Sequence, residues 1–187
     1  MASKWIRTWL IATIAISVIA WLDGGTLAGW LALEPARVWH GQIWRLVTWP
    51  WVQGGPMSLV CTCAVIYALG GALASVWGDR RLRRFVIEIV LVAAIATCVV
   101  AAITRGWHVW RLGGVTISSV LVIAWARQFP HRPLRLYYGL LVLNGRRLVQ
   151  LTVGVAALCA IYFGLAALPE LVACVAAALY PRSLLRR

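Results

Sequence analysis

Acidic residues are scarce in this chain of 187 residues, and charge in general is sparse. Only five residues are Asp or Glu, and charged residues make up 12% of the sequence, whereas a soluble domain has about 25%. Apolar residues make up 63%, and the mean hydropathy is +0.85. An ordinary soluble domain is therefore excluded, and we expect one membrane domain over residues 1–187.

Motifs for metal or redox chemistry are also missing. The five cysteines lie in apolar stretches, no CxxC pair occurs, and no histidine stands near a cysteine at ligand spacing. Cys61 and Cys63 are two residues apart, so on a helix they point in different directions. We interpret the cysteines as small packing residues and expect no metal and no cofactor.

Basic residues are the exception to the scarcity of charge. The 18 Lys and Arg residues give a net charge of +13 and stand in short clusters between apolar runs. Such clusters are typical of topology signals in membrane proteins and argue against nucleic-acid binding. They also predict contact with anionic lipids at the cytoplasmic face.

Six apolar stretches are candidate membrane spans, since about 20 apolar residues cross the hydrocarbon layer. The fourth and sixth are short but rich in small residues, which suits central helices that neighbours shield from lipid. The sequence Asp23-Gly24-Gly25 follows the first stretch without a convincing cleavage site, so we interpret that stretch as a retained anchor. The predicted spans are residues 5–22, 57–77, 85–104, 112–126, 148–167 and 170–181.

The distribution of basic residues supports six spans. With the N-terminus inside, the inner segments carry fourteen Lys and Arg residues and the outer segments carry four. This bias predicts that both chain ends face the cytoplasm. We expect a polytopic all-α bundle in a bacterial inner membrane.

The first outer loop is long and rich in tryptophan. Indole rings favour the headgroup boundary because they combine an apolar body with one N–H donor. We therefore expect this loop to lie partly within the outer leaflet. Its tryptophans are Trp30, Trp39, Trp44, Trp49 and Trp51.

Several motifs follow one another in an order that resembles the rhomboid family. The run Gly41–Thr48 (GQIWRLVT) is followed by Gln53-Gly54-Gly55 and a span, then by the basic turn Gly78–Arg81. Gly113-Gly114 opens the fourth stretch, and Phe129-Pro130 with basic residues closes it. The resemblance covers residues 41 to about 164 and implies a six-helix rhomboid-like fold. Physically, an arginine such as Arg45 in a loop at membrane depth can satisfy several backbone carbonyls, while Trp44 anchors the loop.

The resemblance also implies which residues a protease would need, and they are missing. The nucleophile position falls on Val115 or Thr116, and the sixth stretch contains no histidine. The family's histidine and asparagine on the second helix correspond to Ser58 and Thr62. The histidine of its His-Gly-Gly turn corresponds to Gln53. We therefore expect no enzymatic activity, since a hydroxyl is a weak nucleophile without a neighbouring base.

Another dyad is the alternative to an inactive protein. A hydroxyl of Thr116, Ser118 or Ser119 paired with His40 or His108 is geometrically conceivable. Loop histidines are more often interface residues, and serine in a short span more often serves helix packing.

The fourth and sixth stretches, in which the family carries its dyad, contain small residues suited to helix packing. Gly114 and Ser118 in the fourth stretch, and Ala173 with Ala177 in the sixth, are pairs of small residues at the spacing that lets helices approach closely. Two acidic residues also lie in apolar stretches. We expect Glu88 to pair with Arg84 four residues earlier, and Glu170 to reach water near Arg105 or Arg111.

Four functions are compatible with this pattern. The first is a non-catalytic protein that binds transmembrane helices of client proteins in a groove near Thr62, Thr116 and Ser118. The second is a structural subunit of a larger membrane complex. The third is a divergent protease that uses Thr116 or Ser118, and a transporter is a weaker fourth because only Glu88 and Glu170 are ionisable at depth.

Overall fold

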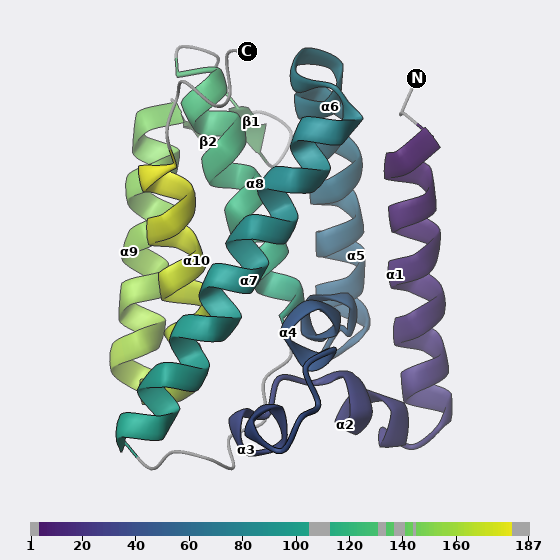
Figure 1. Cartoon of the computed structure of the whole chain (residues 1–187). Helices are drawn as coiled ribbons and strands as arrows, with labels where there is room; N and C mark the ends of the chain where they lie inside the picture. The colour runs from purple at the N-terminus through teal and green to yellow at the C-terminus, as the bar shows by residue number, and fades with distance from the viewer. Residues whose placement is uncertain (1–3, 105–112, 131–133, 137–140, 144, 181–187) are drawn as a thin grey trace.

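The computed structural model describes residues 4–104, 113–130, 134–136, 141–143 and 145–180, and nearly all of these are helical (Figure 1). The second long helix is continuous from Pro56 to Trp77 and contains one π-helical turn, Ile66–Gly70, between α5 (Pro56–Val65) and α6 (Gly71–Trp77). The other long helices are α1 (Lys4–Leu22), α7 (Asp79–Thr104), α8 (Gly114–Gln128), α9 (Gly145–Phe163) and α10 (Leu168–Leu179).

Helix α8 lies at the centre of the bundle. It packs against α5, α9 and α10, and α10 in turn packs against α7 (Figure 1). Residues 114–126 of α8 carry no charge, and most of them are buried. A helix that is apolar on all sides is typical of such a central position.

Within the described residues, four helices are long and apolar enough to cross a membrane: α1, the helix from Pro56 to Trp77, α7 and α9. Helices α8 and α10 have 15 and 12 residues and are shorter than a full span. The prediction of a polytopic helical membrane protein is confirmed at this level, whereas the count of six spans stays a prediction.

The observed boundaries differ from the predicted spans where polar residues are helical. Helix α7 begins at Asp79, six residues before the predicted start. The basic residues between Arg80 and Arg84 are not apolar, but they continue the helix because arginine is a good helix former. Helix α9 ends at Phe163, and the 3₁₀ turn Gly164–Ala167 leads into α10, where Pro169 stands in the first turn.

One short hairpin interrupts the predicted all-α architecture. Strands β1 (Leu134–Leu136) and β2 (Leu141–Leu143) pair antiparallel between α8 and α9, with Arg135 opposite Val142. Over the rest of the described chain, the prediction of a helical fold is confirmed.

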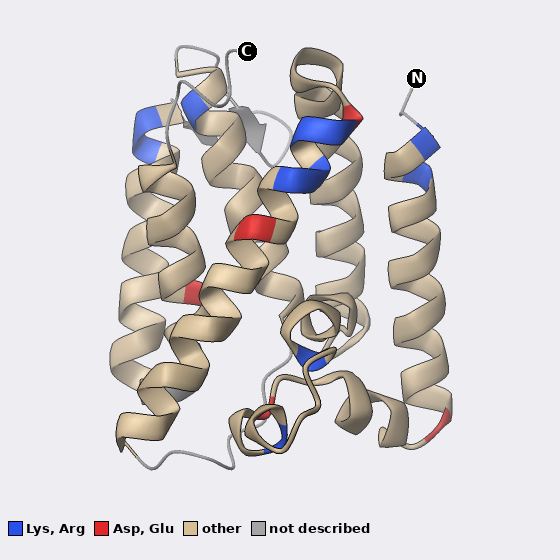
Figure 2. Cartoon of the chain, in the orientation of Figure 1, with Lys and Arg blue, Asp and Glu red and all other residues tan. Residues whose placement is uncertain are grey.

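The basic residues and the first loop occupy opposite ends of the bundle. Most of the described Lys and Arg residues lie at one end, where α1 begins (Figure 2). The loop forms three short helices at the other end, α2 (Thr26–Leu31), α3 (Pro35–Trp39) and α4 (Arg45–Thr48), and a 3₁₀ turn, Trp49–Trp51. Trp30, Trp39 and Trp44 are between 43% and 60% exposed, which is the exposure that contact with lipid at the interface requires.

We predict that Gly145→Ala destabilises the bundle, whereas Gly154→Ala in the same helix does not. A Cβ at position 145 would lie 2.6 Å from the carbonyl oxygen of Ala126 and 3.0 Å from the Cα of Pro130, so α9 would have to move away from the end of α8. Nothing lies within 4 Å of a Cβ at position 154. Overpacking of this kind costs about 1–3 kcal/mol.

Thermal unfolding in detergent, followed by circular dichroism, measures both variants. Equal melting temperatures for the two variants would contradict the close approach of α9 to α8.

Candidate functional site

The first loop is held together by the side chain of Arg45, which is fully buried. Its Nη1 donates to the carbonyl oxygens of Gly29 at 2.6 Å and Ala32 at 2.7 Å, and its Nε donates to Gln42 Oε1 at 2.7 Å. Both carbonyls lie at the C-terminal end of α2, where a helix leaves its last carbonyls without partners. Arg45 therefore joins α4 to the end of α2.

The guanidinium of Arg45 is ionised although its surroundings lower its pKa. Burial lowers the pKa of Arg45, and the positive charge of Arg37 lowers it further, whereas Glu34 raises it. Glu34 itself pairs with Arg37 at 2.7 Å. An arginine stays protonated in proteins, so Arg45 can donate hydrogen bonds but cannot accept a proton. Its contacts are therefore structural.

A closed cluster of polar side chains joins the loop to α5 and α8. Ser118 Oγ of α8 donates to Thr62 Oγ1 of α5 at 3.1 Å, and Thr62 Oγ1 donates in turn to Gln53 Oε1 at 3.2 Å. Ser58 Oγ donates to the same amide oxygen at 2.8 Å. The cluster thus brings together Ser58, Thr62 and Ser118, three of the residues singled out from the sequence.

Gln53 is the centre of this cluster, and sequence reasoning missed its role. Its side chain is 1% exposed and packs directly on Gly114, where an added Cβ would lie 1.7 Å from Gln53 Oε1. Its backbone is fixed to α1, because its N–H donates to Ser17 Oγ and its carbonyl accepts from Trp21 Nε1 at 3.1 Å. The sequence revealed only that glutamine stands where the resemblance implies histidine.

The residues at the predicted nucleophile position do not join the cluster. Val115 is 54% exposed, and Thr116 is 3% exposed on a different face of α8 from Ser118. The predicted groove near Thr62, Thr116 and Ser118 is therefore not one polar surface, since Thr62 and Ser118 bond to each other while Thr116 faces elsewhere.

The histidines proposed as alternative bases do not reach the hydroxyls in the described part of the chain. His40 is exposed at the end of α3, and no hydrogen bond joins it to Thr116, Ser118 or Ser119 among the described residues. His108 lies outside the described residues. The search for a metal site within those residues found no group of three His, Cys, Asp or Glu side chains.

Ser119 and Glu170 form a polar pair between α8 and α10 that the sequence did not reveal. Ser119 Oγ donates to Glu170 Oε1 at 3.1 Å, and the thiol of Cys174 lies beside both residues. Glu170 is half-buried, so it does not simply extend into water as predicted. Arg105 and Arg111, its proposed neighbours, lie outside the described residues.

The small residues that were predicted to pack do so against different helices. Gly114 and Ser118 face Gln53 and α5, because their contacts are with Gln53 and Thr62. Ala173 and Ala177 are fully buried on α10, which packs against α7 and α8.

Arg127 and Glu88 fix the end of α10. Arg127 donates to the carbonyl oxygens of Ala177 at 2.6 Å and Tyr180 at 2.8 Å. The predicted pair of Arg84 with Glu88 is confirmed at 2.6 Å, and the hydroxyl of Tyr180 donates to the other carboxylate oxygen. Glu88 therefore has a structural role in joining α7 to the end of α10.

We predict that Arg45→Lys loosens the first loop although the charge is kept. A lysine is a point charge on a flexible stem and cannot make three bonds in the fixed geometry of a guanidinium. Loss of hydrogen bonds to a charged group costs about 1.5–3 kcal/mol. Limited proteolysis in detergent should show faster cleavage between residues 23 and 55, and Arg37→Lys on the loop's surface is the matched control. Unchanged cleavage in Arg45→Lys would refute the role of the guanidinium.

Comparison with known proteins assigns a family. A family described as "Eukaryotic integral membrane protein (DUF1751)" matches residues 7–184 of the chain. No curated protein matches the chain.

This match corrects the predicted location. A bacterial inner membrane is wrong, because the family is one of eukaryotic integral membrane proteins. The prediction of an integral membrane protein is confirmed, and it rests on the same match and on the four helices long enough to span a bilayer. The chain belongs to the DUF1751 family of eukaryotic integral membrane proteins.

Proposed function

We propose that this protein is a rhomboid-like pseudoprotease that performs no hydrolysis and instead binds transmembrane helices of partner proteins. The order of the Gly41–Thr48 run, the Gln53-Gly54-Gly55 turn and the glycines that open α8 supports the rhomboid-like assignment. The arrangement of Arg45 within the loop agrees with the organising role that the resemblance implies for it.

The observation that carries the proposal is the position of the Gln53 amide against α8. The hydroxyl protons of Ser118, Thr62 and Ser58 all have acceptors, and the chain of bonds from Ser118 ends on the amide oxygen of Gln53. An amide oxygen accepts a hydrogen bond but does not take up a proton at neutral pH. None of these hydroxyls is activated as a nucleophile.

Close packing on Gly114 gives a second reason for inactivity. Gln53 fills the space beside the opening turn of α8, with its Oε1 where even a methyl group at position 114 would collide. A substrate carbonyl would have to displace a side chain that is 1% exposed and accepts two hydrogen bonds from α5.

One face of α8 is partly exposed at the edge of its contact with α5, and a partner helix would bind there. Val115, Ser118 and Val122 lie at spacings that place them on one side of the helix. Val115 is 54% exposed, and Ser118 and Val122 are half-buried. The small side chain of Ser118 allows a second helix to approach closely, and its oxygen offers an acceptor to a polar group of that helix.

A second candidate function is a hydrolase with Ser119 as nucleophile and Glu170 as base. The hydrogen bond of 3.1 Å between them, on the two helices that would carry a dyad, favours it. However, Ser119 lies inside α8, where backbone N–H groups bond within the helix and are not free to stabilise an oxyanion. An interhelical bond that holds α10 against α8 explains the pair without chemistry.

The two candidates differ in their response to a serine-directed probe. We predict that the purified protein in mild detergent is not labelled by a fluorophosphonate, and that Ser118→Ala and Ser119→Ala do not change this result. Labelling that is lost in Ser119→Ala and reduced at least tenfold in Glu170→Gln would establish the hydrolase and overturn the inactive-protein proposal.

Partner binding is tested by a photo-crosslinking residue at position 115. We predict adducts with transmembrane segments of other proteins at Val115, and at least fivefold fewer at Ile14, a control position on α1 that is 43% exposed. Ser118→Leu should reduce the adducts because it covers the close-approach surface. Equal adducts at both positions would contradict a specific binding face, and one partner recovered in a fixed ratio would instead indicate a structural subunit of a complex.

A further inference from the structure

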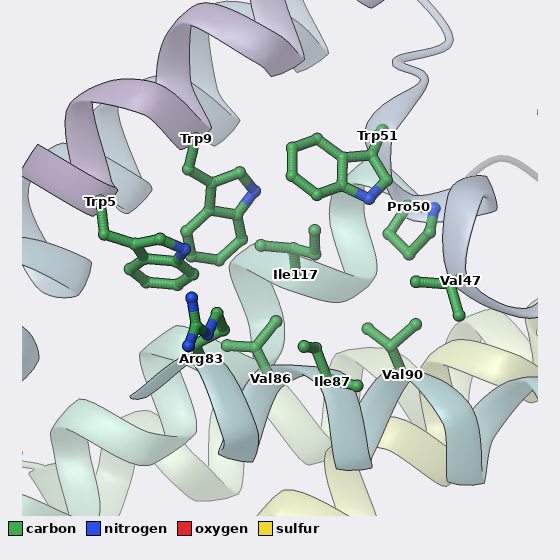
Figure 3. Close-up of a pocket in the computed structure, with 10 residues that line it drawn as sticks. All are labelled: Trp5, Trp9, Val47, Pro50, Trp51, Arg83, Val86, Ile87, Val90 and Ile117. Carbon is green, nitrogen blue, oxygen red and sulfur yellow. The ribbon is translucent and has the colours of Figure 1, made fainter. Parts of the chain in front are cut away.

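A pocket lies between α1 and α7, next to the inner part of the first loop (Figure 3). Its lining is almost entirely apolar and aromatic. Trp5 and Trp9 of α1 line one side, Arg83, Val86 and Val90 of α7 line the other, and Trp51 lies beside Trp9. The rings of Trp5, Trp9 and Trp51 form a continuous series, with centroid separations of 4.8 and 6.3 Å.

Arg83 is the charged residue among those that line the pocket, and it gives one end a positive potential. Figure 3 shows its guanidinium beside the ring of Trp5. Among the described residues no ion pair engages Arg83, since the nearby Glu88 pairs with Arg84. The remaining charges on the adjoining ends of α1 and α7 are mostly basic: Lys4, Arg7, Asp79, Arg80 and Arg81.

Trp9 supplies an unused hydrogen-bond donor in the same pocket. Its side chain is 3% exposed, and its Nε1 has no hydrogen-bond partner in the part of the chain that the structure describes. Figure 3 shows the nitrogen-bearing edge of the ring turned toward Trp51. A buried donor without an acceptor is costly, so a ligand that brings an acceptor to this position gains from it.

We propose that this pocket is a binding site for one anionic phospholipid. The phosphate binds Arg83, an ester carbonyl accepts from Trp9 Nε1, and an acyl chain lies along Val86, Val90 and Trp51. Residues 83, 86 and 90 share one face of α7 and span about 10 Å along it. The charged residue therefore lies where the phosphate would be, and the apolar residues lie deeper in the membrane, along the acyl chain. Basic pockets between helices on the cytoplasmic side of a membrane are typical of such sites.

A lipid fits the lining better than a partner helix does. Close helix packing in membranes needs small residues at the contact, whereas three indole rings and branched side chains line this pocket. Arg83 provides two or more donors in one plane, which suits a phosphate group. The site is on a different part of the bundle from the α8 face proposed for partner proteins.

The test is native mass spectrometry of the delipidated protein in detergent with phosphatidylserine and phosphatidylcholine of identical acyl chains. We predict one tightly bound phosphatidylserine and a preference of about fivefold over phosphatidylcholine, since one basic residue at a membrane surface contributes about that factor. Arg83→Gln should abolish the preference, and Arg81→Gln, exposed on the same helix but outside the lining, should keep it. Equal binding of the two lipids, or equal effects of the two substitutions, would overturn the proposal.

Two further variants test the rest of the site. Ile87→Trp, which fills the pocket, should reduce the binding of both lipids, whereas Val92→Trp on the exposed side of α7 should not. Trp9→Phe should weaken phosphatidylserine about fivefold but leave its ether-linked analogue, which lacks the carbonyls, unaffected. Melting temperatures within a few degrees of the parent protein ensure that each variant is folded.

If glycerol phosphate competes with the lipid at equal concentration, the site recognises only a phosphate group, and the assignment of a lipid is wrong. Binding of the whole lipid without measurable binding of glycerol phosphate supports the contribution of the acyl chain.

Discussion

A bilayer contains no water that could hydrogen-bond a peptide group. In this protein the loop between the first two long helices meets that constraint through the guanidinium of Arg45. Residues 23–55 connect two long helices by three short ones, and each short helix ends with carbonyls that have no partner within it. Arg45 Nη1 binds two of these at the end of α2, and its Nε binds Gln42. The loop lies against α7, with Trp39 and Trp44 exposed, and two carbonyls at the end of α2 are paired within it.

The same constraint determines how the polar side chains inside the bundle are arranged. A hydroxyl in an apolar interior needs an acceptor, and Ser58, Thr62 and Ser118 find one in each other and in Gln53. Their mutual satisfaction stabilises the contact between the loop, α5 and α8. Within this cluster the final acceptor is an amide oxygen, which does not take up a proton at neutral pH, and the proposed loss of hydrolysis rests on this arrangement.

Side-chain bonds between helices hold α10, the shortest of the long helices, in place. Glu170 bonds to Ser119 near its start, and Arg127 binds the carbonyls at its end. By hydropathy alone, residues 170–181 are too short for a clear membrane span. Hydropathy reflects exposure to lipid and contains no information on contact with neighbouring helices. The helix is stable in the bundle because Ala173 and Ala177 allow it to pack closely against α7 and α8.

The sequence by itself determined the class of protein, the approximate positions of the helices and the pair of Arg84 with Glu88, because all three depend on composition or on neighbours within one helix. Tertiary structure decided what long-range contacts control. Gln53 meets Gly114, Ser119 meets Glu170, and Trp9 lies near Arg83, although each pair is more than 50 residues apart in the chain. No local pattern predicts which face of α8 turns toward which neighbour, since an apolar helix without a polar side has no periodicity that orients it.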